Sequence, residues 1–467
     1  MKMQTINKSI LKTTYVFLTL FIIMILYLLF FTVFKSGDII DNSYNKRIET
    51  LNNFTYKGNI YADNGEVIAY TDRESEERVY PYNDLFSHVI GYTGHGSTGL
   101  ESTYNYEMLC SDTNIFGKFS NEITGKKNDG NSINTTLNIE LQQACKSALS
   151  TYSGAIIVMN PKNGDVLSMV SGPSFDPNTL DSEFQNLSQN DNAILLNRAT
   201  QGLYTPGSTF KIFSLYEYLK EHRETYLDYR FTCRGKVDFS DYTIHCANYV
   251  WHGDEDLYSS FANSCNTSFV NLAKDIDVNG LLTLCKDMLF NEKMPLEIDY
   301  NSSIFSLDEN SDDFMISQTV IGQGKTLMTP MHLSMIMAAI ENDGVLMQPR
   351  FVTSIVNPNG EIIEKYDAKE YKTLMPKEDS MLLKSFLLEV VKRGTASSLY
   401  NSNYVLMGKT GTAELDKSDG NVNSWFAGIL ETGEEAYVIT VVIENVNGNY
   451  TPAKDIAKQI IDKIQSN

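Results

Sequence analysis

The feature that most constrains this chain is the stretch Tyr204-Thr-Pro-Gly-Ser-Thr-Phe-Lys-Ile-Phe213. Pro206 and Gly207 break the chain, and the pattern predicts that Ser208 then opens a helix. Ser208 and Lys211 would stand three positions apart on one helix face, so the hydroxyl and the amine can meet. A serine becomes a nucleophile when a neighbouring base takes its proton, and a partly desolvated lysine can be that base. Ser-x-x-Lys alone is a common pattern, however, and a solvated helix start explains most of its occurrences.

Two further triplets follow in the same chain. Residues 264–266 read Ser-Cys-Asn, and residues 409–411 read Lys-Thr-Gly after the strand-like segment 404–407. Ser-x-x-Lys, Ser-x-Asn and Lys-Thr-Gly, in this order, are the motif set of penicillin-binding proteins and class A β-lactamases. The sequence therefore resembles a class B, monofunctional penicillin-binding protein, which is a D,D-transpeptidase of peptidoglycan synthesis.

This resemblance implies a role for each motif residue. Ser208 would attack the carbonyl of the penultimate D-Ala and form an acyl-enzyme, with Lys211 as general base. Ser264 would relay a proton to the leaving D-Ala, and Asn266 would hydrogen-bond the substrate's amide backbone. Lys409 would set the local positive potential. The substrate's terminal carboxylate would be bound by Thr410, Gly411 and Thr412, and the N–H groups of Ser208 and Thr412 would form the oxyanion hole.

Three other functions are alternatives for a chain with these motifs. A β-lactamase needs a base that activates water against the acyl-enzyme, and we find no convincing Glu-x-x-x-Asn element between the second and third motifs. A β-lactam sensor usually has several membrane spans and a cytoplasmic effector domain, whereas only about twelve residues precede the single span described below. A catalytically idle scaffold of the wall-synthesis machinery would not need the intact motifs. We therefore expect a transpeptidase that cross-links stem peptides and is acylated by β-lactams.

The N-terminus predicts a membrane anchor. Residues 13–34 contain no charged side chain and are enough to span a hydrocarbon core. Lys2, Lys8 and Lys12 precede them, which places the N-terminus in the cytoplasm by the positive-inside rule. A cleaved signal peptide is the alternative, but its apolar part is shorter and ends at small residues, whereas residues 30–35 are bulky. We expect a single-pass protein of the cell membrane with its catalytic domain outside the cytoplasm.

The length and the charge set broader limits. A chain of 467 residues exceeds one typical domain, and 42% hydrophobic residues can build a sizeable core. The formal net charge is −20, which argues against binding to nucleic acid or to anionic lipid surfaces. We therefore divide the chain into a cytoplasmic tail (1–12), a transmembrane helix (13–34), an N-terminal pedestal (35–150) and a transpeptidase domain (151–467).

The pedestal segment is strand-rich and carries no evident chemistry. Residues 56–70 predict two short strands around an Asn-Gly turn. They resemble the family's Arg-Gly-x-Ile-x-Asp-Arg-Asn-Gly segment, with Lys57 in place of the first arginine. Residues 99–104 resemble its Gly-Leu-Glu-x-x-Tyr segment. We expect a small pedestal that holds the catalytic domain away from the membrane.

Residues 134–467 predict the catalytic fold. A helix capped near Asn138 should run to Leu149, followed by a hairpin of two strands within 153–170. Strands at 404–411, 425–430 and 436–444 should join this hairpin, and 453–464 should form an amphipathic helix. The resemblance implies the α/β (α+β) serine transpeptidase fold, with an antiparallel sheet flanked by helices beside a helical subdomain. Segments 321–324 and 328–334 also match the family pattern.

The resemblance also implies partners. Peptidoglycan stem peptides ending in D-Ala-D-Ala and β-lactams would bind the active site, and the chemistry would require no cofactor. Because the chain has no polymerase domain, a membrane glycosyltransferase of the shape, elongation, division or sporulation type would be its partner.

The cysteines leave three alternatives open. Cys145 and Cys285 sit in apolar helical settings and are expected to be buried thiols. The region after the first motif resembles elongation-type class B proteins, some of which hold a structural metal beside the active site. A Cys₃His zinc set is one alternative, a Cys233–Cys246 disulfide is the second, and free thiols are the third. The six cysteines are Cys110, Cys145, Cys233, Cys246, Cys265 and Cys285, and the zinc ligands would be Cys233, Cys246, His252 and Cys265.

Overall fold

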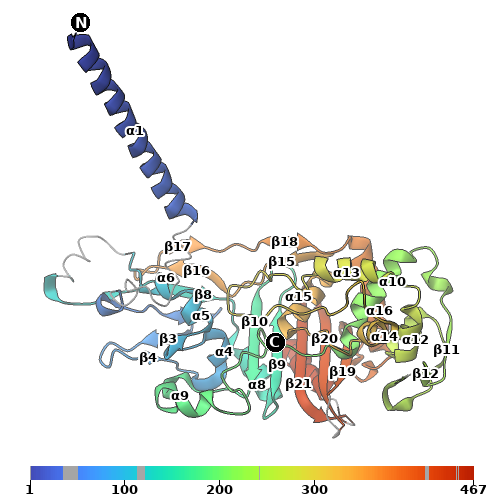
Figure 1. The fold of residues 1–467 in the computed structure, drawn as a ribbon. Coiled ribbons are helices and arrows are strands. Elements are labelled where there is room, and N and C mark those ends of the chain that lie inside the picture. Colours follow the sequence, from blue (N-terminus) through green and yellow to red (C-terminus); the bar gives the residue numbers. More distant parts are fainter. Residues whose placement is uncertain are drawn as a thin grey trace.

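A computed structural model describes residues 2–34, 51–112, 121, 123–240, 242–415, 420–448, 450 and 452–466. Its centre is a five-stranded antiparallel sheet in the order β10-β9-β21-β20-β19 (Figure 1). The predicted hairpin and the three later strands are all present in it, so the predicted antiparallel sheet is confirmed. The strands are β9 (Gly154–Met159), β10 (Val166–Gly172), β19 (Val405–Glu414), β20 (Asn421–Thr432) and β21 (Glu435–Asn447).

Two pairs of helices cover this sheet. Helices α8 (Ile139–Leu149) and α17 (Ala453–Ser466) pack on each other and on the sheet, as do α15 (Pro330–Glu341) and α16 (Lys377–Lys392). All six residues of β9 are buried, because a strand covered on both faces exposes neither set of side chains. The predicted cap is confirmed, since the Asn138 side chain accepts a hydrogen bond from the Leu141 N–H at the start of α8.

A mostly helical subdomain lies beside the edge strand β19 (Figure 1). The predicted helix at the Ser-x-x-Lys motif starts later than expected. Ser208 lies in the 3₁₀ turn Gly207–Thr209, and the α-helix α10 begins at Lys211. The subdomain contains α10 (Lys211–Glu221), α11 (Leu257–Ala262), α12 (Asn266–Leu272), α13 (Val278–Asp287) and α14 (Asp313–Val320). Two short antiparallel pairs join β11 (Phe231–Cys233) with β14 (Gly253–Glu255) and β12 (Lys236–Asp238) with β13 (Thr243–His245).

A second sheet, which we call the pedestal sheet because most of its strands lie in the segment expected to form the pedestal, has the order β17-β16-β8-β2-β3-β4. The strands predicted within 56–70 are confirmed as the antiparallel pair β2 (Ile60–Tyr61) and β3 (Val67–Thr71). The other members are β4 (Arg78–Val79), β8 (Ser132–Thr135), β16 (Val352–Val356) and β17 (Ile362–Lys365). Strands β16 and β17 come from the middle of segment 151–467, so this sheet combines two distant parts of the chain. Residues 35–50, with which the expected pedestal begins, lie outside the described residues.

The two pedestal segments noted in the sequence meet at a buried ion cluster. The carboxylate of Glu101 is fully buried and lies 2.7 Å from Lys57 Nζ and 2.7 Å from Arg78 Nε. Lys57, from the first segment, therefore forms an ion pair with the glutamate of the Gly-Leu-Glu segment. A buried carboxylate needs such partners because its desolvation is costly.

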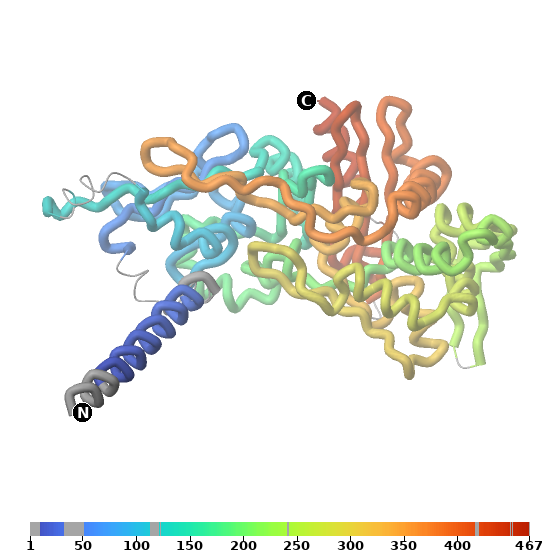
Figure 2. Tube along the Cα trace, turned by 90° about the horizontal axis from the view of Figure 1, so that it is seen from above, coloured from blue at the N-terminus to red at the C-terminus, as the bar shows by residue number. Residues whose placement is uncertain are grey.

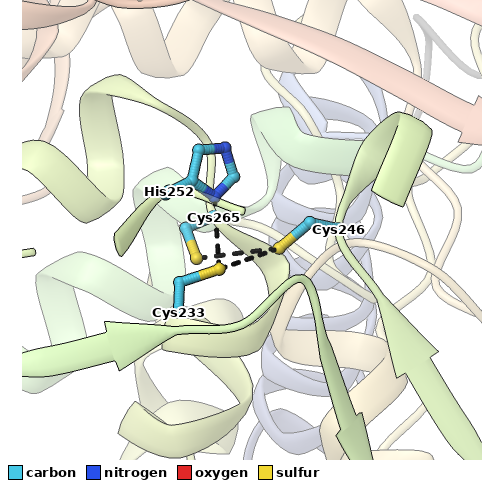
Figure 3. A group of neighbouring side chains, drawn as sticks. All are labelled: Cys233, Cys246, His252 and Cys265. Carbon is cyan, nitrogen blue, oxygen red and sulfur yellow. Dashed lines mark hydrogen bonds between the residues drawn. The ribbon is translucent and has the colours of Figure 1, made fainter. Parts of the chain in front are cut away.

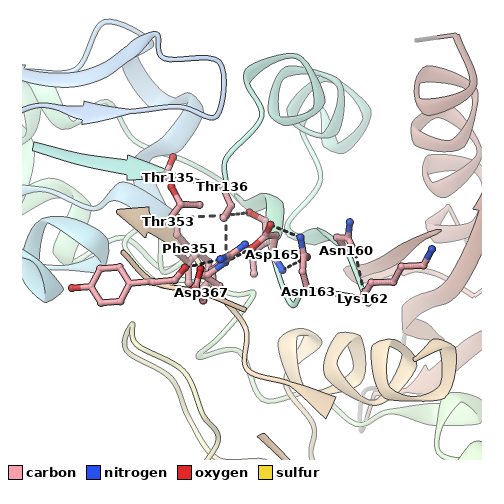
Figure 4. A network of polar contacts seen from close by, with 12 residues as sticks. Thr135, Thr136, Asn160, Lys162, Asn163, Asp165, Phe351, Thr353 and Asp367 are labelled. Carbon is pink, nitrogen blue, oxygen red and sulfur yellow. Dashed lines mark hydrogen bonds and ion pairs between the residues drawn. The ribbon is translucent and has the colours of Figure 1, made fainter. Parts of the chain in front are cut away.

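The joint between the sheets is a network of polar contacts (Figure 4). Asp165, in the turn between β9 and β10, forms an ion pair with Arg350 just before β16. The Thr136 hydroxyl donates to the Val166 carbonyl at 2.6 Å and also lies 3.1 Å from the Arg350 carbonyl. These contacts connect the five-stranded sheet, through the β9–β10 turn, to the segment that leads into β16 of the second sheet.

Helix α1 (Lys2–Phe34) stands apart from the body of the protein (Figures 1 and 2). Its segment Ile10–Phe31 is long and apolar enough to cross a membrane, and none of the most apolar window is buried in the protein. This agrees with the predicted span by length and composition.

The remaining elements are short connections. The strands are β1 (Thr55–Tyr56), β5 (Thr93–Gly94), β6 (Gly96–Ser97), β7 (Asn128–Asp129), β15 (Val345–Met347) and β18 (Glu370–Thr373). The helices are α4 (Ser87–Ile90), α5 (Gly99–Thr103), α6 (Asn105–Leu109) and α9 (Leu180–Ser188).

Candidate active site

Ser208 is held by a tightly packed turn. Gly207 has φ 54°, and a Cβ there would lie 2.6 Å from the Thr412 carbonyl oxygen of β19. Gly322 packs against the same turn, because its carbonyl accepts the Gly207 N–H at 2.8 Å. A Cβ on Gly322 would lie 1.8 Å from the Gly207 oxygen. The Gly-Gln-Gly segment 321–324 therefore supports the nucleophile turn, and only glycine fits at both contacts.

Lys211 is the central contact of the site. Its Nζ lies 3.0 Å from Ser208 Oγ, 2.8 Å from the Ser264 carbonyl oxygen and 2.6 Å from Asn266 Oδ1. Both of the latter oxygens are acceptors only, so they take two N–H donors of the amine. In the neutral amine, the remaining lone pair is then free for the Ser208 hydroxyl proton. The side chain is completely buried, and burial lowers its pKa to about 8.

Lys409 approaches Ser264 from β19. Its Nζ lies 2.9 Å from Ser264 Oγ and 3.2 Å from the Thr410 carbonyl oxygen. Ser264 Oγ is also 3.2 Å from Lys211 Nζ, so the hydroxyl bridges the two lysines. Burial first, and then the neighbouring Lys211 charge, holds the pKa of Lys409 well below its usual range. Ser264 has φ 55°, a backbone conformation that is uncommon for serine.

Asn266 begins helix α12 and joins three elements. Its Oδ1 accepts from Lys211, and its Nδ2 donates to the His245 carbonyl at the end of β13 at 2.9 Å. In this geometry both ends of the amide side chain are engaged.

Thr410, Gly411 and Thr412 lie on the edge strand β19. Thr410 Oγ1 is 2.6 Å from the hydroxyl of Thr395, a residue that the sequence reasoning did not select. A Cβ on Gly411 would lie 2.9 Å from Thr209 Cγ2 and 3.0 Å from the Pro206 oxygen. This glycine allows the nucleophile turn to rest against β19.

These residues open into a cleft of about 700 Å³. Ser208, Asn266, Thr410 and Thr412 line it, whereas Lys211 and Lys409 are completely buried beneath it. The structure therefore brings all eight predicted catalytic and substrate-binding residues to one place.

The predicted metal residues also converge (Figure 3). One ligand atom from each of Cys233, Cys246, His252 and Cys265 lies within 4.8 Å of all the others. Cys246 Sγ is 3.7 Å from Cys233 Sγ and 3.7 Å from Cys265 Sγ, and Cys233 Sγ is 3.4 Å from His252 Nδ1. A disulfide has an S–S distance of about 2.0 Å, so none joins these sulfurs in this structure.

The cluster has the dimensions of a tetrahedral zinc site. Two sulfurs at about 2.3 Å from one zinc ion lie about 3.8 Å apart in that geometry, close to the observed separations. The backbone N–H groups of Gly235 and Ser268 lie 3.4 Å from Cys233 Sγ and Cys265 Sγ respectively. N–H donors directed at sulfur stabilise thiolates around a metal. The side chains present therefore fit a zinc ion.

Several residues near the site carry no sequence motif. Asn263 and Gln323 also line the cleft, and Glu255 is buried with its Oε1 accepting from Asn263 Nδ2 at 2.9 Å. Glu297 has the Glu-x-x-x-Asn spacing to Asn301 that deacylating enzymes use, but it accepts from Tyr104 of the pedestal side at 2.9 Å and does not line the cleft. No short-range sequence pattern distinguishes the residues that line the cleft from Glu297, because contacts between distant parts of the chain decide which residues reach the cleft.

The fold and the site define a serine acyl-transfer enzyme in which a buried lysine contacts the serine hydroxyl. Residues 154–462 match the family model described as the penicillin binding protein transpeptidase domain, and residues 57–133 match that of the penicillin binding protein A dimerisation domain. The first match covers more than half of the chain, so the chain belongs to the penicillin-binding protein transpeptidase family.

Known relatives support the same placement. The chain is 25% identical to peptidoglycan D,D-transpeptidase PbpA of Mycolicibacterium smegmatis, with 94% of each chain covered. It is 27% identical to stage V sporulation protein D of Bacillus subtilis, where 84% of this chain covers 63% of that longer protein. A structure of penicillin-binding protein A from M. tuberculosis as its penicillin G acyl-enzyme superposes with a TM-score of 0.77 at 25% identity, over 88% of this chain and 100% of that chain.

Proposed function

We propose that this protein is a membrane-anchored peptidoglycan D,D-transpeptidase that works through an acyl-enzyme on Ser208. The observation that carries the proposal is the contact of Lys211 Nζ with Ser208 Oγ at 3.0 Å, while two acceptor-only oxygens, the Ser264 carbonyl and Asn266 Oδ1, take N–H donors of the amine. A lysine with its pKa lowered to about 8 can take the hydroxyl proton near neutral pH.

The remaining motif residues take the following roles in this mechanism. Ser264 passes a proton between the lysines and the leaving D-Ala, since its Oγ contacts both amines. Asn266 orients the substrate amide. Lys409 adds positive potential, and Thr410, Gly411 and Thr412 receive the substrate's carboxylate along β19. The N–H groups of Ser208 and Thr412 form the oxyanion hole, typically worth about 3 kcal/mol for each donor.

Covalent labelling tests the proposal directly. The full-length protein in detergent is incubated with a fluorescent penicillin, and the modified peptide is identified by mass spectrometry. A stable ester at Ser208 is the expected result. Turnover of the drug within seconds would instead assign the protein to the β-lactamases, and no label at Ser208 would end the proposal.

A structural zinc ion at Cys233, Cys246, His252 and Cys265 is the second part of the proposal. Its support is the tetrahedral spacing of the four ligand atoms. The ion would neutralise the thiolates and join β11, the Cys246 turn and the start of α12, which carries Asn266. Metal analysis of protein purified without an affinity metal column tests it. One equivalent of zinc is expected, and less than about a tenth of an equivalent would contradict it.

We also propose the domain order of the sequence analysis, with one addition. The tail is 1–12, the membrane helix 13–34, the pedestal 35–150 and the transpeptidase domain 151–467, with β16 and β17 of the last segment completing the pedestal sheet. The anchor places the catalytic domain outside the cytoplasm. A membrane glycosyltransferase would supply the glycan strands, and co-purification of such a polymerase with the intact chain from membranes tests this part.

A further inference from the structure

The connection between Cys246 and His252 carries three consecutive exposed apolar side chains. Tyr249 is 69% exposed, Val250 47% and Trp251 74%. We call residues 247–251 the lip. Large apolar side chains that the chain's own fold leaves uncovered in one patch indicate a contact with another molecule.

The shape of the lip is held by the surrounding fold. Cys246 and His252 fasten its two ends to the cysteine–histidine cluster. Within it, Asn248 and Tyr249 have φ of 53° and 56°, a conformation that is costly for tyrosine and persists only where neighbouring contacts impose it. The lip rests on Gly235, where a Cβ would lie 2.5 Å from Trp251 Cδ1 and 3.0 Å from the Tyr249 oxygen.

The lip is also part of the catalytic cleft. Ala247, Asn248 and Val250 line the same cleft as Ser208, and the exposed side chains of Tyr249 and Trp251 alternate with them along the chain at its border. The segment just before the lip is tied to the second motif, because the His245 carbonyl accepts the Asn266 amide at 2.9 Å. A molecule that reaches the Ser208 ester from this side therefore passes the lip.

The proposed reaction needs two substrates in this cleft. The donor ends in the carboxylate that β19 receives, and it leaves its acyl group on Ser208. The acceptor amine then attacks the ester carbonyl, a C–N bond forms and the C–Oγ bond breaks. The proton lost by the amine returns to Ser208 Oγ through Lys211. Water in place of the amine would give hydrolysis, so the acceptor needs its own binding surface.

We propose that the lip binds this acceptor, a primary amine at the end of an aliphatic chain on a second peptidoglycan stem. Methylene groups pack on apolar side chains, and the incoming ammonium group is attracted to the faces of tryptophan and tyrosine. The ammonium group gives one proton to water before the neutral amine enters the cleft and attacks the ester. The net charge of −20 further favours a cationic ligand over an anionic one. The inference rests on the proposed function and names the second substrate's site.

The experiment separates the two half-reactions. Full-length wild type, Trp251→Ala and Tyr249→Ala are acylated with a thioester donor and offered either a long acceptor, a stem peptide with an aliphatic side-chain amine, or a short acceptor, glycinamide. In the variants, the ratio of aminolysis to hydrolysis should fall about fivefold to tenfold with the long acceptor only. Penicillin acylation, which involves no acceptor, should stay within about twofold.

Two controls complete the test. Tyr371→Ala removes an exposed aromatic side chain on β18 that does not line the cleft, and its ratio should equal the wild-type ratio. Trp425, the other tryptophan, is buried but lines the cleft, so only the part of the quenching by the long acceptor that Trp251→Ala abolishes reports contact with the lip.

An unchanged ratio in both lip variants would overturn the inference. Equal losses with long and short acceptors, or a parallel loss of penicillin acylation, would also overturn it, because the lip would then be structural. If the wild type forms no ester at Ser208, the proposed function fails instead, which is a separate result.

Discussion

Two buried polar clusters share one three-residue segment of this protein. Ser264 and Asn266 contact the catalytic Lys211, whereas Cys265 between them belongs to the cysteine–histidine cluster. Because neighbouring residues of this short turn belong to different clusters, the same backbone supports both of them. Any change that moves this turn therefore affects both.

The two clusters differ in how their polar groups are satisfied. The catalytic one is complete within the chain, because each lysine nitrogen has oxygen partners within 3.2 Å. The other gathers three sulfurs and one ring nitrogen, all donors to a soft cation. The comparison suggests that the first cluster carries the reaction and that the second holds the turn in place. The predictions below test this division.

The largest effect is expected from removal of the nucleophile. Ser208→Ala should abolish covalent labelling by penicillin while leaving the fold intact, because the side chain is small and only partly buried. Labelling is measured by gel fluorescence and folding by thermal melting. A variant that still carries label would place the nucleophile elsewhere.

The next largest effects on the acylation rate are expected from substitution of the two buried lysines, Lys211 and Lys409. Lys211→Ala removes the base and should slow acylation about 10²-fold to 10⁴-fold. Lys409→Ala removes a positive charge beside Ser264 and should slow it by about 10²-fold or more. Stopped-flow acylation measures both rates, and near wild-type rates in either variant would contradict its assigned role. Lys236→Ala, an exposed lysine outside the cleft, is the matched control.

A smaller, joint effect is expected at the cysteine–histidine cluster. Cys246→Ser should lower the melting temperature by several degrees and acylation severalfold, because losing this ligand would weaken the hold of the proposed zinc ion on the turn of Ser264. A chelator should do the same to wild type. Cys145→Ser, at a buried thiol outside the cluster, should leave chelator sensitivity unchanged. Sensitivity to reductant instead of chelator would indicate a disulfide.

The last prediction concerns the pH dependence of the unsubstituted protein. Lys211 acts as a base only when neutral, and burial lowers its pKa to about 8. Acylation should therefore rise with pH, about tenfold for each unit well below this pKa, and level off above it. A rate that keeps rising towards the ordinary lysine pKa of 10.5 would show that the amine is not perturbed.

Much of the local structure was predictable from short patterns. Asn138 caps α8 as expected, and the Asn64-Gly65 turn joins β2 and β3. Such features depend on neighbours within a few residues, so the sequence states them directly. The start of the Ser-x-x-Lys helix was predicted three residues too early, because a packed 3₁₀ turn against β19 and Gly322 replaces the first helical turn.

By itself, the sequence determined the three motifs, their order, the apolar anchor and the identity of the four possible metal ligands. Residue types and spacing along the chain are sufficient for these, since each is a chemical or local property. Only the tertiary structure decided which residues far apart in the sequence come into contact. It placed β16 and β17 in the pedestal sheet, set Thr395 against Thr410, and left Trp251 exposed on the loop that borders the cleft. These contacts join residues far apart in sequence, and long-range packing, which no local pattern encodes, fixes their distances.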